Sequence, residues 1–222
     1  MRRIVPVWIN SCNQVTYLKN IVGKFIANDF HAIFVLDNGS DYEPLQDYYQ
    51  EVCRPQSPVT VFFYNINRGP RYFHYKRIYS MIGDGPHLFT DPDIDFDTLA
   101  DDFLCRLIDL SETLKIPKVG VALEIPDESE IKQAAAEGLS VRQNEQKYWT
   151  NPIAENIFDA PVDTTLHLFN PKYFTNPDEF IQGIRVAGPG FTVRHLPWYK
   201  TDPMPPDEYL YYKSRDIGYS HC

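Results

Sequence analysis

Three carboxylates alternate with other residues in the segment 91–95 (DPDID), which is the strongest chemical signal in the sequence. Carboxylates this close repel one another and raise each other's pKa unless a cation lies among them. Oxygen donors that leave positions open suit a hard divalent ion such as Mg²⁺ or Mn²⁺. The segment follows the apolar stretch 87–90, which is typical of a buried strand. This placement favours a metal site over the alternative, a solvated acidic loop that caps the helix expected near Thr98.

Two further polar clusters also follow apolar stretches. Asp37 and Asn38 directly follow the apolar stretch 32–36, and the turn 67–71 (NRGPR) comes after the apolar stretch 59–64. Apolar strands that alternate with helices indicate a parallel sheet covered on both faces. In such sheets ligands bind beyond the carboxyl ends of the strands. We therefore expect the polar clusters to meet at one edge.

The elements that must position these clusters are read from the spacing of apolar residues. The pattern predicts strands over 4–9, 32–36, 59–64, 87–90 and 119–123, and helices over 15–26, 45–53, 72–81 and 99–114. The second half is less regular: a polar helix or loop is expected over 128–148, a strand with one wet face over 162–169, two strand-like pieces around 188–190, and an extended tail from Pro197. We expect one domain over residues 1–200 and a surface-packed extension over 201–222.

Composition narrows the classes of protein. The chain has 222 residues, 43% hydrophobic and 23% charged, which is an ordinary globular composition. A net charge of −9 argues against a general nucleic-acid or anionic-membrane binder. No apolar run is long enough for a membrane span, and the first one stops at Asn10, too soon for a secretory signal. The four cysteines lack metal-site spacing, which predicts reduced thiols and a cytoplasmic location.

The ordered motifs resemble those of GT-A glycosyltransferases. A start with Pro6-Val7-Trp8, an acidic strand end at Asp37, the turn at Asn67 and a DxD after the fourth strand are closest to the inverting, family-2-like branch. The later segments 160–165 (APVDTT), 185–189 (RVAGP) and 194–199 (RHLPWY) are similar to a bacterial and viral subset of these enzymes. The resemblance covers about residues 3–200. A DxD alone is weak evidence, whereas DxD followed by HLPWY is fairly specific.

The resemblance implies a fold and an activity. The fold is a three-layer α/β/α sandwich with a mostly parallel sheet. The activity is hexosyltransferase-type transfer from a nucleotide-diphosphate sugar, with UDP favoured, to the hydroxyl of a glycan, lipid-linked or protein-borne acceptor. It depends on a divalent ion, Mn²⁺ or Mg²⁺. By position, Asp91 and Asp93 match the metal-binding DxD and His195 matches a late histidine ligand. Asp95 leaves open a second register, and His167 competes with His195.

Donor-binding residues carried over from the resemblance lie near the first four strands. They are Pro6, Val7, Trp8, Asp37, Asn67, Arg68, Arg71 and Asp91. Arginine forks suit diphosphate oxygens. Several of these residues also have a structural alternative. Trp8 could be a core aromatic, Asp37 could begin a turn, and Arg71 could be a surface charge.

An inverting transfer needs a general base, and Asp163 is the best match to the family's late acid. The alternative for Asp163 is a local Asp–Thr turn. Asp159 and Glu155 remain candidates, because the Glu-Asp pair of many relatives is missing here. Two other functions stay open. One is a non-catalytic module that binds nucleotide sugar or glycan. The other, a sugar-phosphate nucleotidyltransferase, would need a glycine-rich basic loop where residues 10–14 (NSCNQ) stand.

Overall fold

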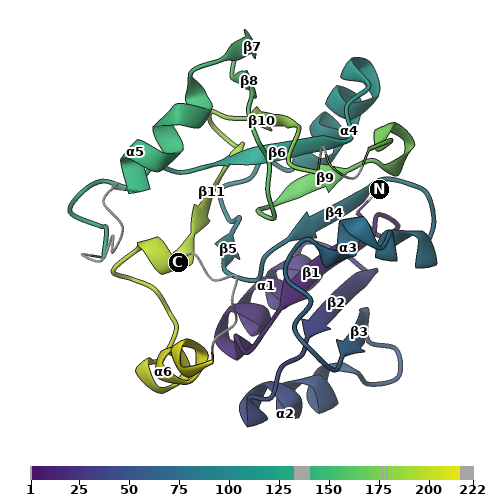
Figure 1. The fold of residues 1–222 in the computed structure, drawn as a ribbon, viewed down its shortest axis with the longest axis vertical. Helices are drawn as coiled ribbons and strands as arrows, with labels where there is room; N and C mark the ends of the chain where they lie inside the picture. Colours follow the sequence, from purple (N-terminus) through teal and green to yellow (C-terminus); the bar gives the residue numbers. More distant parts are fainter. Residues whose placement is uncertain (1, 133–140, 177, 179, 216–222) are drawn as a thin grey trace. The chain divides into compact units, whose positions relative to one another are not determined.

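The computed structural model describes residues 2–132, 141–176, 178 and 180–215 (Figure 1). The chain divides into two compact units, one formed by Met1–Asp93 with Pro203–Cys222 and the other by Ile94–Asp202. Each unit is described by itself. The boundary expected at residue 200 stays a prediction.

The first unit is built on a parallel sheet with strand order β3-β2-β1-β4. The strands are β1 (Val7–Ser11), β2 (Ile33–Asn38), β3 (Val59–Tyr64) and β4 (His87–Thr90). In the register Ser11 lies beside Asp37 and Ile9 lies beside Thr90. Because every pair is parallel, the four carboxyl ends share one edge. The strands predicted over 32–36, 59–64 and 87–90 and their parallel arrangement are confirmed, whereas the strand expected over 4–9 is Val7–Ser11.

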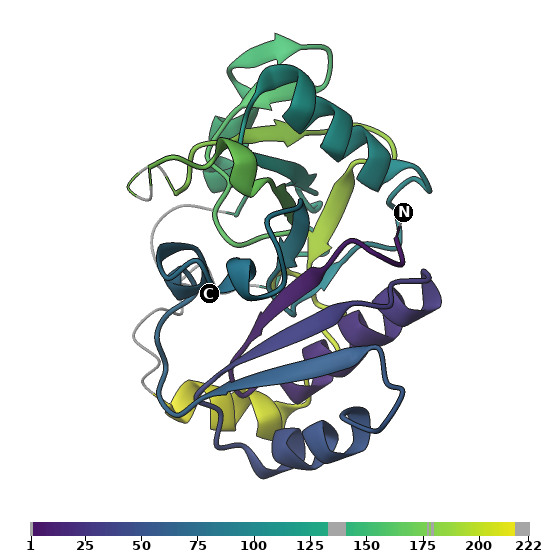
Figure 2. The ribbon, with the colours of Figure 1, turned by 90° about the vertical axis from the view of Figure 1, so that its right-hand side faces the viewer.

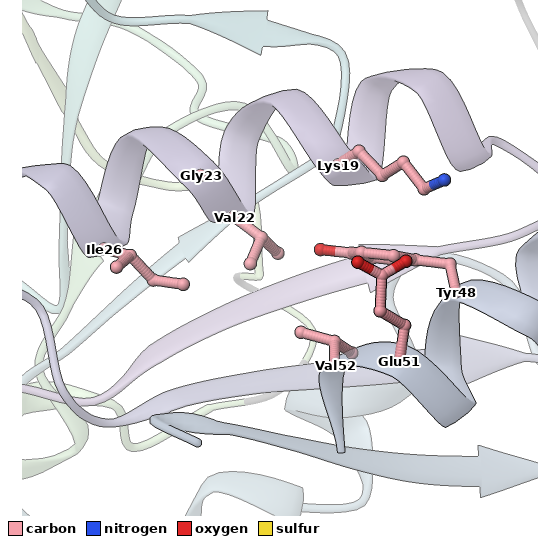
Figure 3. Close-up of a pocket in the computed structure, with 7 residues that line it drawn as sticks. All are labelled: Lys19, Val22, Gly23, Ile26, Tyr48, Glu51 and Val52. Atoms are coloured by element: carbon pink, nitrogen blue, oxygen red, sulfur yellow. The ribbon is translucent and has the colours of Figure 1, made fainter. Parts of the chain in front are cut away.

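Helices cover this sheet. They are α1 (Val15–Ala27), α2 (Glu43–Val52) and α3 (Tyr72–Tyr75). A further helix of this unit, α6 (Pro206–Ser214), contacts the first turn of α1 and the loop after β2. The apolar residues of α1 recur every three or four positions, which puts them on one buried face. Between α1 and α2 lies a groove of about 360 Å³ (Figure 3), where the ammonium of Lys19 is 5.2 Å from the centre of the Tyr48 ring. This groove belongs to the helical layer and is separate from the strand ends.

Trp8 is the centre of an aromatic cluster in the first unit. Its ring is fully buried, 4.8 Å from Phe34 on β2 and 4.9 Å from Phe73 on α3 between ring centres. Phe73 also lies 4.9 Å from Phe89 on β4. The cluster ties α3 to one face of the sheet, so α3 fixes the turn that precedes it.

The second unit holds a mixed sheet with order β9-β6-β10-β8-β7. Its strands are β5 (Ile94–Asp95), β6 (Lys118–Leu123), β7 (Pro152–Ala154), β8 (Ile157–Asp159), β9 (His167–Phe169), β10 (Ile184–Val186) and β11 (Thr192–His195). Its α-helices are α4 (Phe103–Leu114) and α5 (Val141–Gln146). Strand β11 runs parallel to the end of β6 and antiparallel to β5. Short 3-10 helices in the two units span Ile78–Met81, Lys147–Trp149, Pro171–Tyr173 and Leu196–Trp198.

Two local predictions were wrong. The strand expected over 162–169 is only His167–Phe169, and it has no wet face because all three residues are buried. The tail expected to be extended contains helix α6, whose first helical residue is Pro206. Proline fits the first turn of a helix, where its missing N–H has no partner to lose. The polar segment expected over 128–148 includes α5, but residues 133–140 lie outside the described residues. Within the described part of the chain, no helix has the length and apolar character needed to span a membrane.

Candidate functional site

Side chains and main-chain groups join the loops that follow β1 and β2. The main-chain N–H of Asn13 donates a hydrogen bond to Oγ of Ser40 at 3.0 Å. Its side-chain Oδ1 accepts hydrogen bonds from the main-chain N–H groups of Asp41 at 2.9 Å and Tyr42 at 3.0 Å. Asn13 is 2% exposed and has φ of 54°, a left-handed conformation that asparagine tolerates. Asn13 therefore fixes the position of the second loop against the first.

Asp37 is the next-to-last residue of β2, and its carboxylate is turned into the protein. Oδ1 accepts the main-chain N–H of Ser40 at 3.0 Å, and Oδ2 accepts the hydroxyl of Tyr49 at 2.7 Å. Asp37 is 2% exposed. The turn that the sequence offered as the alternative for Asp37 is present, while its contact with a donor stays a prediction.

The loop after β3 is bound to the same edge. Oδ1 of Asn38 accepts the main-chain N–H of Arg68 at 2.7 Å. Gly39 has φ of +77°, and a Cβ there would lie 2.7 Å from the main-chain nitrogen of Asn67. The exposed Arg68 guanidinium lies 5.6 Å from the centre of the Tyr72 ring. The predicted meeting of the clusters after β2 and β3 is therefore confirmed within the first unit.

Asp91 and Asp93 follow β4, whose parallel pairing with β1 brings its carboxyl end to this edge. Asp91 is half-buried and Asp93 is 6% exposed. Over residues 2–132, 141–176, 178 and 180–215, no three His, Cys, Asp or Glu side chains converge as a metal cluster. Two carboxylates are nevertheless the donor set that Mg²⁺ and Mn²⁺ accept alongside water and substrate phosphates. The chemistry of Asp91 and Asp93 fits such an ion.

The donor contacts expected of Pro6, Val7 and Trp8 stay a prediction, and the structure places these residues apart from the other clusters. Val7 begins β1, so these three residues lie at the amino end of the strand, away from the edge where the other clusters meet. Val7 and Trp8 are also fully buried, and the Trp8 ring belongs to the aromatic cluster. Trp8 is thus a core aromatic, the alternative that the sequence had offered.

Ser11 ends β1, and Cys12 and Asn13 follow it directly. The donor-binding residues predicted from the sequence did not include these three. Nδ2 of Asn67 lies 3.9 Å from Sγ of Cys12, which links the first loop to the third. Burial, followed by the nearby charges of Asp37 and Asp41, raises the pKa of the Cys12 thiol to about 12. The signal for these positions is the short gap between the first apolar strand and the helix that begins at Val15.

The late candidates lie in the second unit. His195 ends β11, is paired with Ile94 of β5, and has its ring 4.7 Å from that of Trp198. Ile94 directly follows Asp93 in the chain. His167 is fully buried, with Nδ1 2.6 Å from the carbonyl oxygen of Thr165, and burial holds its pKa well below the ordinary value. The idea that His167 shares a wet strand face with Asp163 is therefore wrong.

Among the candidate bases, Asp163 is half-buried, whereas Glu155 and Asp159 are exposed on the hairpin of β7 and β8. The carbonyl oxygens of residues 161–163 accept hydrogen bonds from buried Lys118 and Arg185. The guanidinium of Arg185 also pairs with Glu145 at 2.9 Å. These cations could not be predicted from the sequence, because a lysine inside an apolar strand has no distinct motif.

The C-terminal helix α6 lies beside the loops after β1 and β2 (Figure 2). Glu208 accepts the main-chain N–H of Thr16 at 2.9 Å, at the first turn of α1. The hydroxyl of Tyr211 lies 3.0 Å from Oδ1 of Asp41, and the Tyr211 and Tyr42 rings are 4.6 Å apart. Residues beyond 200 thus help to order the strand edge. Arg71, at the start of α3, is exposed.

No family model matches the sequence, and no curated protein matches it. Solved structures do match. The mannosyltransferase PcManGT from Pyrobaculum calidifontis, in complex with GDP-Man and Mn²⁺, aligns over 95% of this chain with TM-score 0.52 and 13% identity. GalNAc-T7 with UDP, GalNAc and Mn²⁺ aligns over 95% with TM-score 0.53 and 13% identity. HddC from Yersinia pseudotuberculosis, complexed with GMP-PN, aligns over 95% with TM-score 0.51 and 11% identity.

These similarities show the fold. The chain has the mixed α/β architecture of GT-A nucleotide-sugar transferases, as the sequence predicted. It spans 60% of the length of the mannosyltransferase and 48% of GalNAc-T7, but 99% of HddC.

Proposed function

We propose that the chain is a glycosyltransferase of the hexosyl type. It moves a sugar from a nucleotide-diphosphate donor, with UDP favoured, to the hydroxyl of a glycan, lipid-linked or protein-borne acceptor. The observation that carries the proposal is the joining of the loops after β1, β2 and β3 at one sheet edge. Asp91 and Asp93 follow β4, whose carboxyl end lies at the same edge. In open α/β sheets this edge is where ligands bind.

The donor nucleotide would occupy this edge. Asn67, Arg68 and Arg71 supply an amide and two guanidinium groups for the diphosphate. The turn begun by Asp37 shapes the floor below the nucleotide. The groups proposed from β1 are those of Ser11, Cys12 and Asn13, in place of the residues at the start of the strand. A cytoplasmic location follows from the proposal, because nucleotide sugars are made there.

Asp91 and Asp93 are the proposed ligands of Mn²⁺ or Mg²⁺, with His195 as a third; Asp93 with Asp95 is the second possible pair. The similar structures of PcManGT with GDP-Man and of GalNAc-T7 with UDP both contain Mn²⁺. His195 is supported by its pairing with Ile94, one residue after Asp93. When bound, such an ion would offset the negative charge that develops on the diphosphate leaving group.

Asp163 is the proposed general base. The acceptor oxygen forms a bond to the anomeric carbon of the sugar while its proton passes to the Asp163 carboxylate. The bond from that carbon to the diphosphate oxygen breaks, and its electron pair stays on the diphosphate. Attack from the face opposite the leaving group inverts the anomeric centre.

Thermal shift and calorimetry with UDP-, GDP- and dTDP-sugars, each with and without Mn²⁺, test the donor and the metal together. A ligand that binds the folded state stabilises it by about 2.7 kcal/mol when its free concentration is a hundred times Kd. The melting temperature rises as a result. We expect a shift that needs Mn²⁺ and disappears in Asp93→Ala. The exposed Asp97→Asn is the matched control and should keep it. A Mn²⁺-dependent shift that survives in Asp93→Ala would refute the metal assignment.

Turnover separates the proposal from its alternatives. Release of nucleoside diphosphate from the donor, with an acceptor or with water, supports a transferase. Binding without any release would make the chain a non-catalytic module. Pyrophosphate released from a nucleoside triphosphate and a sugar phosphate would instead indicate a nucleotidyltransferase.

A further inference from the structure

Two buried cations hold three consecutive carbonyl oxygens in the second unit. Nζ of Lys118 donates to the carbonyl oxygens of Val162 at 2.7 Å and Asp163 at 2.8 Å. Nε of Arg185 donates to the carbonyl oxygen of Pro161 at 2.8 Å. Lys118 is 0% exposed and Arg185 is 6% exposed. The main chain of residues 161–163, which we call the clamped segment, is therefore fixed at every carbonyl.

Lys118 is a buried charged residue in the otherwise apolar strand β6. Its strand neighbours are apolar, and its ammonium lies 3.8 Å from the centre of the Phe180 ring. Burying a charge is costly, and an apolar residue of similar volume at such a site is often neutral or stabilising. A lysine that only filled space would thus be a poor solution. Its distinctive property here is the pair of hydrogen bonds to the clamped segment.

Two glycines let the clamped segment approach the sheet closely. A Cβ on Gly183 would lie 2.9 Å from the carbonyl oxygen of Lys118 and 3.1 Å from Cγ2 of Val162. A Cβ on Gly120 would lie 2.9 Å from Cγ1 of Val162. The N–H of Val162 donates to the carbonyl oxygen of Ile181 at 2.8 Å. The segment is held by packing on one side and by the cations on the other.

We propose that Lys118 is a positioning residue that fixes the main chain of Asp163, so that its half-buried carboxylate is held in the orientation needed to accept a proton. The inference rests on the proposed function, in which Asp163 is the general base. A base must lie within hydrogen-bond reach of the proton that it removes. Displacement by about 1 Å costs on the order of a hundredfold in rate. The buried ammonium of Lys118, bonded to the main-chain carbonyl oxygen of Asp163, prevents such a displacement.

The test compares Lys118→Met, Asp163→Asn and the double variant, using the release of nucleoside diphosphate from the sugar nucleotide that gives the largest thermal shift. We expect Lys118→Met to lower kcat about a hundredfold, with the donor KM changed less than about threefold, since the donor edge is untouched. In the Asp163→Asn background, Lys118→Met should cause no further loss. Lys172→Met removes an exposed lysine of the same unit and should leave kcat unchanged.

Hydrogen exchange measures the clamp without any donor. Amides of a peptide covering 161–166 should exchange faster in Lys118→Met than in wild type, and equally in Lys172→Met. If Lys118→Met does not fold, Gly183→Ala is the second variant, because it keeps the ammonium and crowds Val162. It should also lower kcat at unchanged KM, by about tenfold or more.

The outcomes separate the two ideas. Unchanged exchange over 161–166, or a further loss of kcat in the double variant, would overturn the role of Lys118 while leaving the transferase proposal intact. Full activity in Asp163→Asn would remove the base itself and, with it, the function given to Lys118. If no donor is turned over, the proposed function fails. The positioning role of Lys118 then fails with it, and faster exchange in Lys118→Met shows only that Lys118 stabilises the clamped segment.

Discussion

The hydroxyl of Tyr49 on α2 donates to Oδ2 of Asp37 at 2.7 Å, with both residues less than 4% exposed. This bond ties the helical layer to the end of β2, in the loop cluster proposed to hold the nucleotide. Burial and the adjacent carboxylate raise the pKa of the Tyr49 hydroxyl above its ordinary value, so it keeps its proton and stays a donor. The bond therefore persists over the whole physiological pH range.

Removing that donor should weaken both the fold and the site. Hydrogen bonds to charged groups contribute about 1.5–3 kcal/mol, and we expect Tyr49→Phe to lower the free energy of unfolding by that amount in urea titrations. Tyr48→Phe is the matched control on the same helix, because it keeps the ring under Lys19 and should change stability little. Equal losses in the two variants would show that the Asp37 bond contributes nothing special.

Much of the first unit could be predicted from sequence because its signals are local. Apolar runs of four to six residues give the strands, and the spacing of Leu18, Ile21 and Phe25 gives α1. Polar residues after parallel strands must share an edge, so the joining of Asp37, Asn38 and Arg68 followed from topology alone.

The rest could not be predicted because it depends on contacts between distant segments. Glu208 binds a residue 192 positions earlier, and Lys118 binds carbonyl oxygens 44 and 45 positions later. No periodicity in the sequence encodes such pairs. The prediction of donor contacts at Pro6, Val7 and Trp8 rests on residue types alone, and the carboxyl end of β1 lies further along the chain, at Ser11.

The docking of α6 on α1 gives a second stability prediction. Glu208 is 2% exposed and accepts the N–H of Thr16, one of the orphan donors of the first turn. Glu208→Ala should lower the free energy of unfolding by about 1–2 kcal/mol, as loss of a helix cap does. Glu208→Gln should lose less, because its amide oxygen still accepts.

Asp207 is the control for this effect, since it is an exposed acid in the same turn of α6. Chemical denaturation together with hydrogen exchange at the Thr16 amide would measure the three variants. A loss in Asp207→Ala as large as that in Glu208→Ala would mean that the helix terminus, and not the contact with α1, is responsible.

Gly39 is the tightest point of the loop cluster. An alanine Cβ would lie 2.7 Å from the main chain of both Ile66 and Asn67, and the φ of +77° is itself strained for alanine. We expect Gly39→Ala to cost roughly 1–3 kcal/mol or more, and to weaken donor binding because the loops after β2 and β3 must separate. Gly23→Ala is the opposite case. Apart from the backbone of α1 itself and the two neighbouring residues, no atom lies within 4 Å of a Cβ there, so it should stabilise by up to about 1 kcal/mol. Urea titrations of both variants would decide, and a neutral Gly39→Ala would contradict the close approach.

Acid should destabilise the first unit through His87 on β4. Burial lowers the pKa of this imidazole to about 4, from an ordinary value of 6.5 in the unfolded chain. Between these values the unfolded state binds a proton that the folded state does not. The stabilisation is therefore complete above pH 6.5 and is lost as the pH falls toward 4, by at most about 3 kcal/mol. Burial also holds the pKa of His167 well below its ordinary value, so acid should destabilise the second unit in the same direction.

The measurement is the free energy of unfolding in urea at intervals from pH 7 to pH 4. His87→Phe keeps a ring among Trp8 and Tyr79 but cannot titrate, so its loss over this range should be smaller than that of wild type. His31→Gln removes an exposed imidazole and should follow the wild-type curve. If His87→Phe loses as much stability as wild type between pH 6.5 and 4, the acid sensitivity comes from other groups and His87 is not buried in its neutral form.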